Sequence, residues 1–274
     1  MPTMPDLALM LVFLLIIGGF AGVIAGLLGV GGGIVLVPAF FYAFSYLGYD
    51  NPQLMQICLA TSLATIIVTS IRSVSAHNRK GAVDWQILRA WAPGIMLGAA
   101  LGVLVATGLK TQTLQAIFGV LGTIVGLYLG LGRPDWRIAD AMPGLVIRAI
   151  LSPALGFLSV LMGIGGGSFG VPLMSLYGQP IHRAVATASG FGVLIALPSV
   201  VGFLFATVAP EGRPPFTFGA VNLIAFVVIV AVSLQTTTYG VKLAHSMNPK
   251  PLKRVFAVFL GIVALNMLRK AAGW

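Results

Sequence analysis

Two glycine runs of similar composition are the residues best suited to bind a solute. Gly29-Val30-Gly31-Gly32-Gly33 has a near copy in Gly163-Ile164-Gly165-Gly166-Gly167. Each glycine costs a helix about 1 kcal/mol relative to alanine, so each run predicts a break between two helical segments. The segment after a break begins with unpaired N–H groups at its positive end, which favours anions. The candidate anion-binding residues are Gly31, Gly32, Gly33, Gly165, Gly166, Gly167 and Ser168. The alternative is that the glycines only allow helices to pack closely.

A stripe of hydroxyl groups is the second candidate. Thr61, Thr65 and Thr69 recur every four residues and Arg72 follows, so all four lie on one face of a helix, with Ser62 beside them. Hydroxyls and a guanidinium suit an oxyanion, because the guanidinium fork binds two oxygens. The alternative is that the hydroxyls bond their own helix and that Arg72 extends to the membrane interface. Both interpretations remain open at this point. Gln235 belongs to a separate polar stretch inside an apolar segment, which indicates a site as much as packing.

The elements that must position these residues are membrane helices. Of 274 residues, 58% are apolar and only 8% charged, and several apolar runs reach the roughly 20 residues that cross a bilayer. The composition predicts an all-α polytopic membrane protein with eight to ten membrane segments. The expected segments are residues 7–28, 34–47, 55–76, 87–108, 114–131, 144–162, 168–177, 183–208, 218–244 and 252–268. The lone cysteine, Cys58, excludes an internal disulfide and a cysteine-cluster metal site, and no cofactor is predicted.

The order of segments repeats, which predicts two homologous halves, residues 1–136 and 137–274. Besides the glycine runs, Ala60-Thr61-Ser62 is echoed by Ala186-Thr187-Ala188, and Gly81-Ala82-Val83-Asp84 by Gly219-Ala220-Val221-Asn222. Halves of this kind are common in transporters, where discontinuous helices form the substrate site at the interface of the halves.

The distribution of basic residues favours an inverted repeat. If every segment crosses and the N-terminus lies outside, twelve Lys and Arg residues face the cytoplasm and four face outward. If the two short segments return to the side they came from, eight spans remain, and with the N-terminus inside the counts become ten and six. The four outward residues of the first arrangement are Lys110, Arg213, Arg269 and Lys270. The short segments, at 1.5 Å per residue, and the Arg269-Lys270 pair argue locally for the second arrangement.

The charged residues also exclude several function classes. The net charge of +10 follows from the cytoplasmic bias of Lys and Arg in membrane proteins, so no nucleic-acid partner is expected. All six acidic residues fall in loops or at segment ends, so we expect no proton relay through a buried carboxylate. We also expect no metal site and no enzymatic activity, because no His or Cys cluster and no paired carboxylates stand inside a segment.

Four sequence features occur together in this chain. They are the doubled glycine motif with its following proline, the Ala60-Thr61-Ser62 element, the stretch His182-Arg183-Ala184-Val185-Ala186-Thr187 and the loop ending Gly81-Ala82-Val83-Asp84-Trp85. Together they resemble the TauE/SafE family of sulfite and organosulfonate exporters. The resemblance covers nearly the whole chain. It implies an inner-membrane permease for sulfite, an organosulfonate or a related small anion, and it adds the candidates His182, Arg183, Thr187 and Ser189. The second copy departs from the pattern, because Ala188 replaces the serine of the Thr-Ser pair.

The leading hypothesis is export of a small oxyanion driven by the membrane potential, with the lipid bilayer and the anion as the expected partners. One alternative is a cation-coupled importer, using Na⁺ or H⁺, of a small sulfur-containing anion or carboxylate. An alternative of another class is a membrane enzyme or a non-transporting assembly subunit. The sequence does not indicate the oligomeric state.

Overall fold

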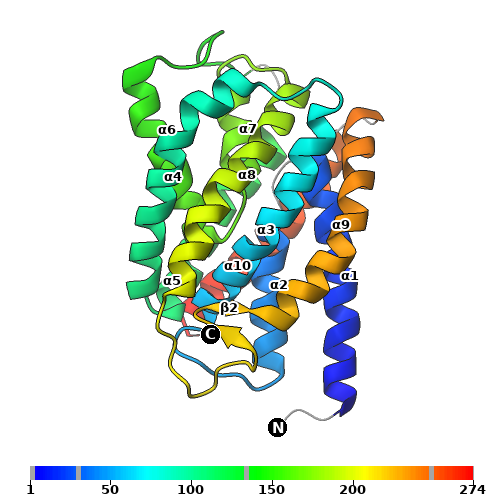
Figure 1. Cartoon of the computed structure of the whole chain (residues 1–274), viewed down its shortest axis with the longest axis vertical. Helices are drawn as coiled ribbons and strands as arrows, with labels where there is room; N and C mark the ends of the chain where they lie inside the picture. Colours follow the sequence, from blue (N-terminus) through cyan, green and yellow to red (C-terminus); the bar gives the residue numbers. More distant parts are fainter. Residues whose placement is uncertain (1–3, 29–31, 133–135, 247–249, 274) are drawn as a thin grey trace.

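Helices make up nearly all of the computed structural model, which describes residues 4–28, 32–132, 136–246 and 250–273 (Figure 1). The helices are α1 (Met4–Leu28), α2 (Gly33–Tyr46), α3 (Leu54–Asn78), α4 (Trp85–Gly108), α5 (Thr111–Leu131), α6 (Leu145–Met162), α7 (Gly167–Leu176), α8 (Ile181–Leu204), α9 (Leu223–Ser246) and α10 (Lys250–Ala271). One antiparallel hairpin, β1 (Thr217–Phe218) with β2 (Val221–Asn222), precedes α9 and was not predicted. The predicted all-α polytopic membrane fold is confirmed.

The lengths of the helices separate full spans from shorter segments. Within the described residues, α3, α4, α5, α6, α8 and α9 are long and apolar enough to cross a membrane. Helices α2 and α7 are shorter, with 14 and 10 residues. α3 and α8 are mostly buried, whereas fewer than half of the residues in the other four spans are buried. These two helices therefore form the centre, and the apolar outer faces of the others suit contact with lipid.

Both predicted breaks lie at the glycine runs. Helix α1 ends at Leu28 and α2 begins after Gly32, whose φ of 77° is left-handed. Helix α6 ends at Met162, and Gly163 follows with a φ of 62° before α7 begins. These positive φ values favour glycine, since a side chain is strained there. The first glycines of the first run, including Gly31, lie outside the described residues.

Contacts between loops assign them to two opposite ends of the bundle. At the lower end in Figure 1, the amide of Asn51 in the α2–α3 loop donates to the carbonyls of Ala209 and Glu211 in the α8–β1 loop, at 2.8 and 2.7 Å. At the upper end, the N–H of Ile138 donates to the carbonyl of Leu176, the last residue of α7. Helices α2 and α7 therefore run in opposite directions, and so do α3 and α8.

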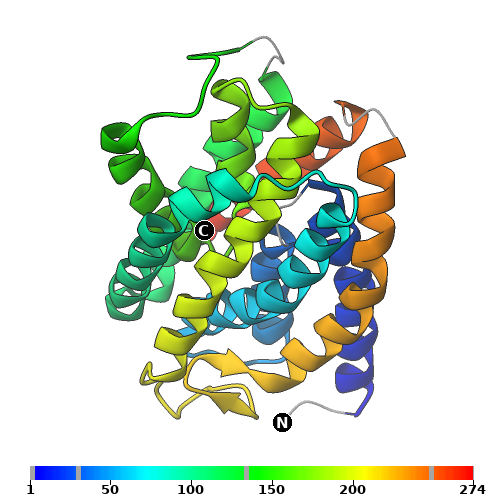
Figure 2. The same cartoon turned by 45° about the horizontal axis from the view of Figure 1, so that its top comes forward.

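The largest helix contacts join the first part of the chain to the second. α1 packs along α9, α4 along α6, and α5 along α10, and α3 contacts α8 (Figures 1 and 2). Glycines spaced four apart let the backbones approach at two of these seams. They are Gly18, Gly22 and Gly26 at the α1–α9 seam and Gly94, Gly98 and Gly102 at the α4–α6 seam. The first part of the chain is therefore packed along its length against the second.

Candidate functional site

The two glycine breaks meet in the buried centre of the bundle. A Cβ atom added to Gly33 would overlap the carbonyl oxygen of Gly163 and would lie 2.9 Å from the Cα of Ile164. The hydroxyl of Ser62 on α3 donates to the same Gly163 carbonyl, at 2.7 Å. Both breaks and α3 are thus joined by direct contact, although the two runs are far apart in the sequence.

Helix α2 begins at this meeting point, and α7 begins four residues after Gly163. The residues before α2 and α7 are Gly32 and Gly166, and neither helix has a side-chain cap. The first N–H groups of a helix have no partner within it and carry its positive end. Ser168, in the first turn of α7, is 3% exposed, and its hydroxyl has no hydrogen-bond partner in the described part of the chain. Amide and hydroxyl donors therefore converge where the sequence predicts an anion.

The same glycines also pack tightly, as the alternative interpretation expected. A Cβ on Gly166 would overlap the Cβ of Phe191 on α8 and lie 2.8 Å from the carbonyl oxygen of Ala188. Gly165 and Gly167 are likewise buried. The centre is closed by backbone contact in this conformation, so the glycines serve close packing here.

Two threonines in matching positions connect distant parts of the chain. The Thr61 hydroxyl oxygen accepts the backbone N–H of Asn222, and the Thr187 hydroxyl oxygen accepts that of Asp84, both at 2.9 Å. Asn222 and Asp84 in turn accept N–H groups at the starts of α9 and α4 with their side chains. Each threonine thus holds the start of a helix from the other half of the chain.

The other predicted hydroxyls bond their own helices. Thr65 donates to the carbonyl of Ser62 at 2.7 Å, Thr69 donates to that of Thr65, and Ser189 donates to that of Ala186. These residues are buried. Thr65 and Ser189 therefore donate their only hydroxyl hydrogen to a carbonyl of their own helix, as the alternative interpretation of the stripe expected.

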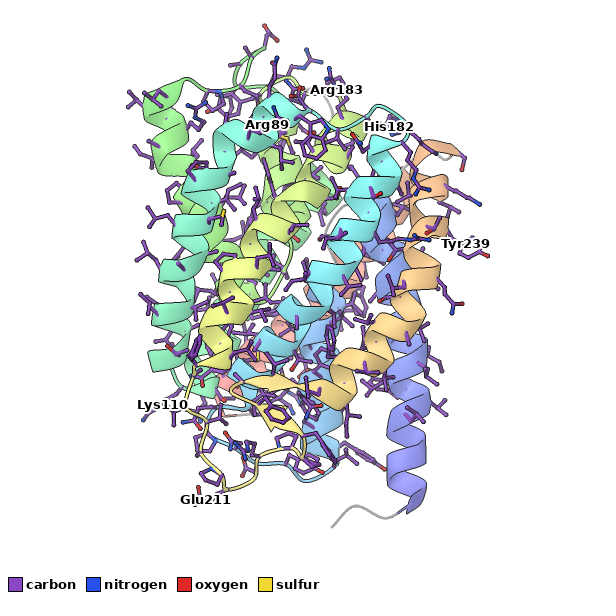
Figure 3. All side chains as sticks on the ribbon, viewed as in Figure 1. Arg89, Lys110, His182, Arg183, Glu211 and Tyr239 are labelled. Carbon is purple, nitrogen blue, oxygen red and sulfur yellow. The ribbon has the colours of Figure 1, made fainter. Side chains whose placement is uncertain are left out.

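The predicted charged candidates lie away from the centre. Arg72 is exposed, and its Nε donates to the Thr238 hydroxyl at 3.2 Å. His182 and Arg183 lie at the upper end of α8 (Figure 3), where Arg183 pairs with Asp84 at 3.3 Å. Gln235 is exposed on α9. The structure does not bring these four residues to the glycine breaks.

Four acidic residues in the described part of the chain lie in loops at the ends of the bundle. Asp50 and Glu211 belong to lower loops, and Asp84 and Asp140 belong to upper ones. Among the described residues, no three His, Cys, Asp or Glu side chains come together as a metal site.

Similarity to known proteins assigns the chain to a family. The model of the sulfite exporter TauE/SafE family matches residues 14–267. The chain belongs to the TauE/SafE family. It is 32% identical over 259 residues to a "probable membrane transporter protein" of Haemophilus influenzae, covering 93% of this chain and 97% of that one. It is 26% identical over 264 residues to one of Methanocaldococcus jannaschii, covering 96% and 97%. No solved structure matches the chain. The family is named for sulfite export, and both relatives are named as probable membrane transporters.

Sequence reasoning missed several residues of this TauE/SafE chain that contact the predicted site residues. Gly163 was predicted only as part of the second glycine run. In the structure its carbonyl accepts a hydrogen bond from the Ser62 hydroxyl, and its backbone contacts Gly33. Asp84 and Asn222 were noticed only as an echo. The repeated position of Asp84 and Asn222 was an available signal, but their partners cannot be inferred from spacing because they lie in the opposite half.

Proposed function

We propose that this transporter is a permease that moves a small oxyanion, sulfite or a small organosulfonate, out of the cell across the inner membrane. The observation that carries the proposal is that two helices begin without a side-chain cap near one buried contact: α2 begins at the contact between Gly33 and Gly163, and α7 begins four residues after Gly163. Helix N-termini attract anions without a charged side chain. The unpartnered Ser168 hydroxyl supplies a further donor.

An inverted repeat with the lower end outside is part of the proposal. Its support is that α2 and α7 run in opposite directions, as do α3 and α8, and that each threonine of the matching pair holds the other half. Arg89 and Arg183 lie at the upper end and Lys110 at the lower end (Figure 3). The predicted excess of basic residues at the upper end favours the cytoplasm on that side.

Transport requires the closed centre to open. Since Gly33 packs on Gly163 and Gly166 packs on Phe191, an anion reaches the amide groups only when α2 or α7 moves away from its neighbours. An anion that leaves an inside-negative cell gains about 2.3 kcal/mol per charge per 100 mV. That energy drives export without a coupling ion.

The test is efflux of radiolabelled sulfite from proteoliposomes that contain the purified chain. We expect an inside-negative potassium diffusion potential to accelerate efflux, and a sodium gradient to have no effect. Ser168→Ala should lower the rate, whereas the control Ser246→Ala, at the exposed end of α9, should not. Flux that depends on a sodium gradient would support a cation-coupled importer instead. A purified chain that moves no anion would support a non-transporting assembly subunit.

A further inference from the structure

A cavity of about 730 Å³ opens at the lower end of the bundle, outside the glycine site. Its wall is formed by the end of α2, the start of α3, the end of α4, the start of α5 and the end of α10. Its volume falls within the range of about 300–1,000 Å³ that ligand pockets occupy. We call this cavity the vestibule.

Two lysines give the vestibule a positive charge. Lys110 precedes α5 and is exposed, and Lys270 is half-buried on α10. The Lys270 ammonium lies 5.1 Å from the centre of the Phe41 ring and 5.0 Å from that of Tyr42, and these contacts hold it at the wall. One carboxylate, that of the exposed Asp50, opposes the two lysines. Lys110 and Lys270 are two of the few basic residues at the lower end, which the proposed orientation puts outside the cell. The cytoplasmic bias of Lys and Arg does not explain basic residues on that side.

A buried amide in the vestibule lacks a partner. Gln115 on α5 is 3% exposed and lines the cavity, and within the described residues its side chain makes no hydrogen bond. The amide is not among the fully buried atoms that lack a partner, so it is open to the cavity, where a ligand or water can satisfy it. Helix α5 also begins here without a side-chain cap, and Thr111 and Gln112 of its first turn line the same wall. Its positive end therefore faces the cavity.

A second glutamine, Gln56, hydrogen-bonds the backbone carbonyls at the end of α4 that would otherwise repel an anion. The last carbonyls of α4 form the negative end of that helix and lie at the vestibule wall. The amide of Gln56 donates to the carbonyls of Ala106, Thr107 and Leu109, at 3.0, 3.1 and 2.8 Å. Gln56 also lies six residues before Ser62 on α3, so the vestibule approaches within about 9 Å, along the helix, of the residue that holds Gly163.

We infer that the vestibule is a second anion-binding site of the transporter, where a small sulfur oxyanion binds between the glycine centre and the lower surface, held by Lys270, Lys110 and the Gln115 amide. Its role in transport rests on the proposed function, whereas binding in the vestibule can be measured without flux.

The test uses a cysteine reporter in the purified full-length chain in detergent. Cys58 is fully buried, so Gln112→Cys adds the reactive thiol at the vestibule wall. The reaction rates of a sulfonate-bearing and a trimethylammonium-bearing methanethiosulfonate reagent are compared at low salt. We expect the anionic reagent to react about tenfold faster, and Lys270→Gln to lower that ratio roughly threefold. Sulfate should slow the reaction, and Gln115→Leu should weaken this protection severalfold.

Matched controls separate the vestibule from the general surface. Thr113→Cys, on the same helix turn but outside the cavity, should show neither preference nor protection by sulfate. Lys242→Gln removes an exposed lysine that lies over Tyr239 on α9, and it should leave the ratio at Gln112→Cys unchanged.

The outcomes distinguish this inference from the proposed function. Equal rates for the two reagents, or a Lys270→Gln variant with an unchanged ratio, would refute anion binding in the vestibule even if sulfite efflux is normal. If the anionic reagent is clearly preferred and sulfate protects the thiol, but the chain moves no anion, anion binding in the vestibule is supported and the permease function is refuted.

Discussion

Gly33→Ala tests whether the two glycine breaks touch. The added methyl group would overlap the Gly163 carbonyl and lie 2.8 Å from the Cδ1 of Ile66 and 2.9 Å from the Cα of Ile164. Ile66 can turn its terminal methyl away, but the Gly163–Ile164 backbone can yield only if α6 and α7 shift. Overpacking of this kind costs about 1–3 kcal/mol. Each kcal/mol lowers the Tm of a chain of this size by roughly 2–4 °C, so we expect a fall of about 2–12 °C.

The matched control is Gly261→Ala. Gly261 lies in the middle of α10, and a Cβ there would meet no atom within 4 Å. Alanine favours a helix by about 1 kcal/mol over glycine, so this variant should be as stable as the parent or slightly more stable. The assay is thermal unfolding of both purified variants in the same detergent. If Gly33→Ala melts at or above Gly261→Ala, the contact between the two breaks, and the central site built on it, would be refuted.

Four further substitutions test contacts that hold loops and helix starts at the two ends of the bundle. Thr61→Val and Thr187→Val each leave a backbone N–H without its acceptor, which should lower the free energy of unfolding by about 1–3 kcal/mol. Because the two sites lie at opposite ends of the bundle, the losses should be nearly additive in the double variant. Strongly non-additive losses would contradict independent roles of the two threonines. Asn51→Ala removes the donors that hold the carbonyls of the α8–β1 loop and should speed proteolysis within it, as mapped by mass spectrometry; protection equal to that of the parent would show that other contacts hold the loop. Arg183→Gln breaks a half-exposed ion pair and should change the free energy of unfolding by less than about 1 kcal/mol; a larger loss would indicate a structural role for the pair.

Local features of the chain were predictable because they depend on neighbours in the sequence. Apolar runs of bilayer length predict helices, and glycine runs break them at Gly32 and Gly163 for reasons of backbone entropy. The echo of Thr61 in Thr187 was also visible. Such signals predicted the class of protein and most of the helix boundaries to within a few residues.

The partners of these residues were decided by tertiary structure. Spacing put Thr65 and Arg72 on one helix face, but it could not show that Thr65 bonds its own helix while Arg72 reaches α9. The vestibule joins five helix ends, and Gln115 gave no signal in the sequence, since an isolated glutamine near a helix start is ordinary.

The sequence alone determined that this chain is a membrane protein with two glycine-broken stretches, because hydropathy and backbone entropy act within a single segment. Only the tertiary structure decided that Gly33 contacts Gly163, and that the free amide of Gln115 shares a cavity with Lys270. Contacts between residues so far apart depend on how whole helices pack, and packing is a property of all the surfaces together.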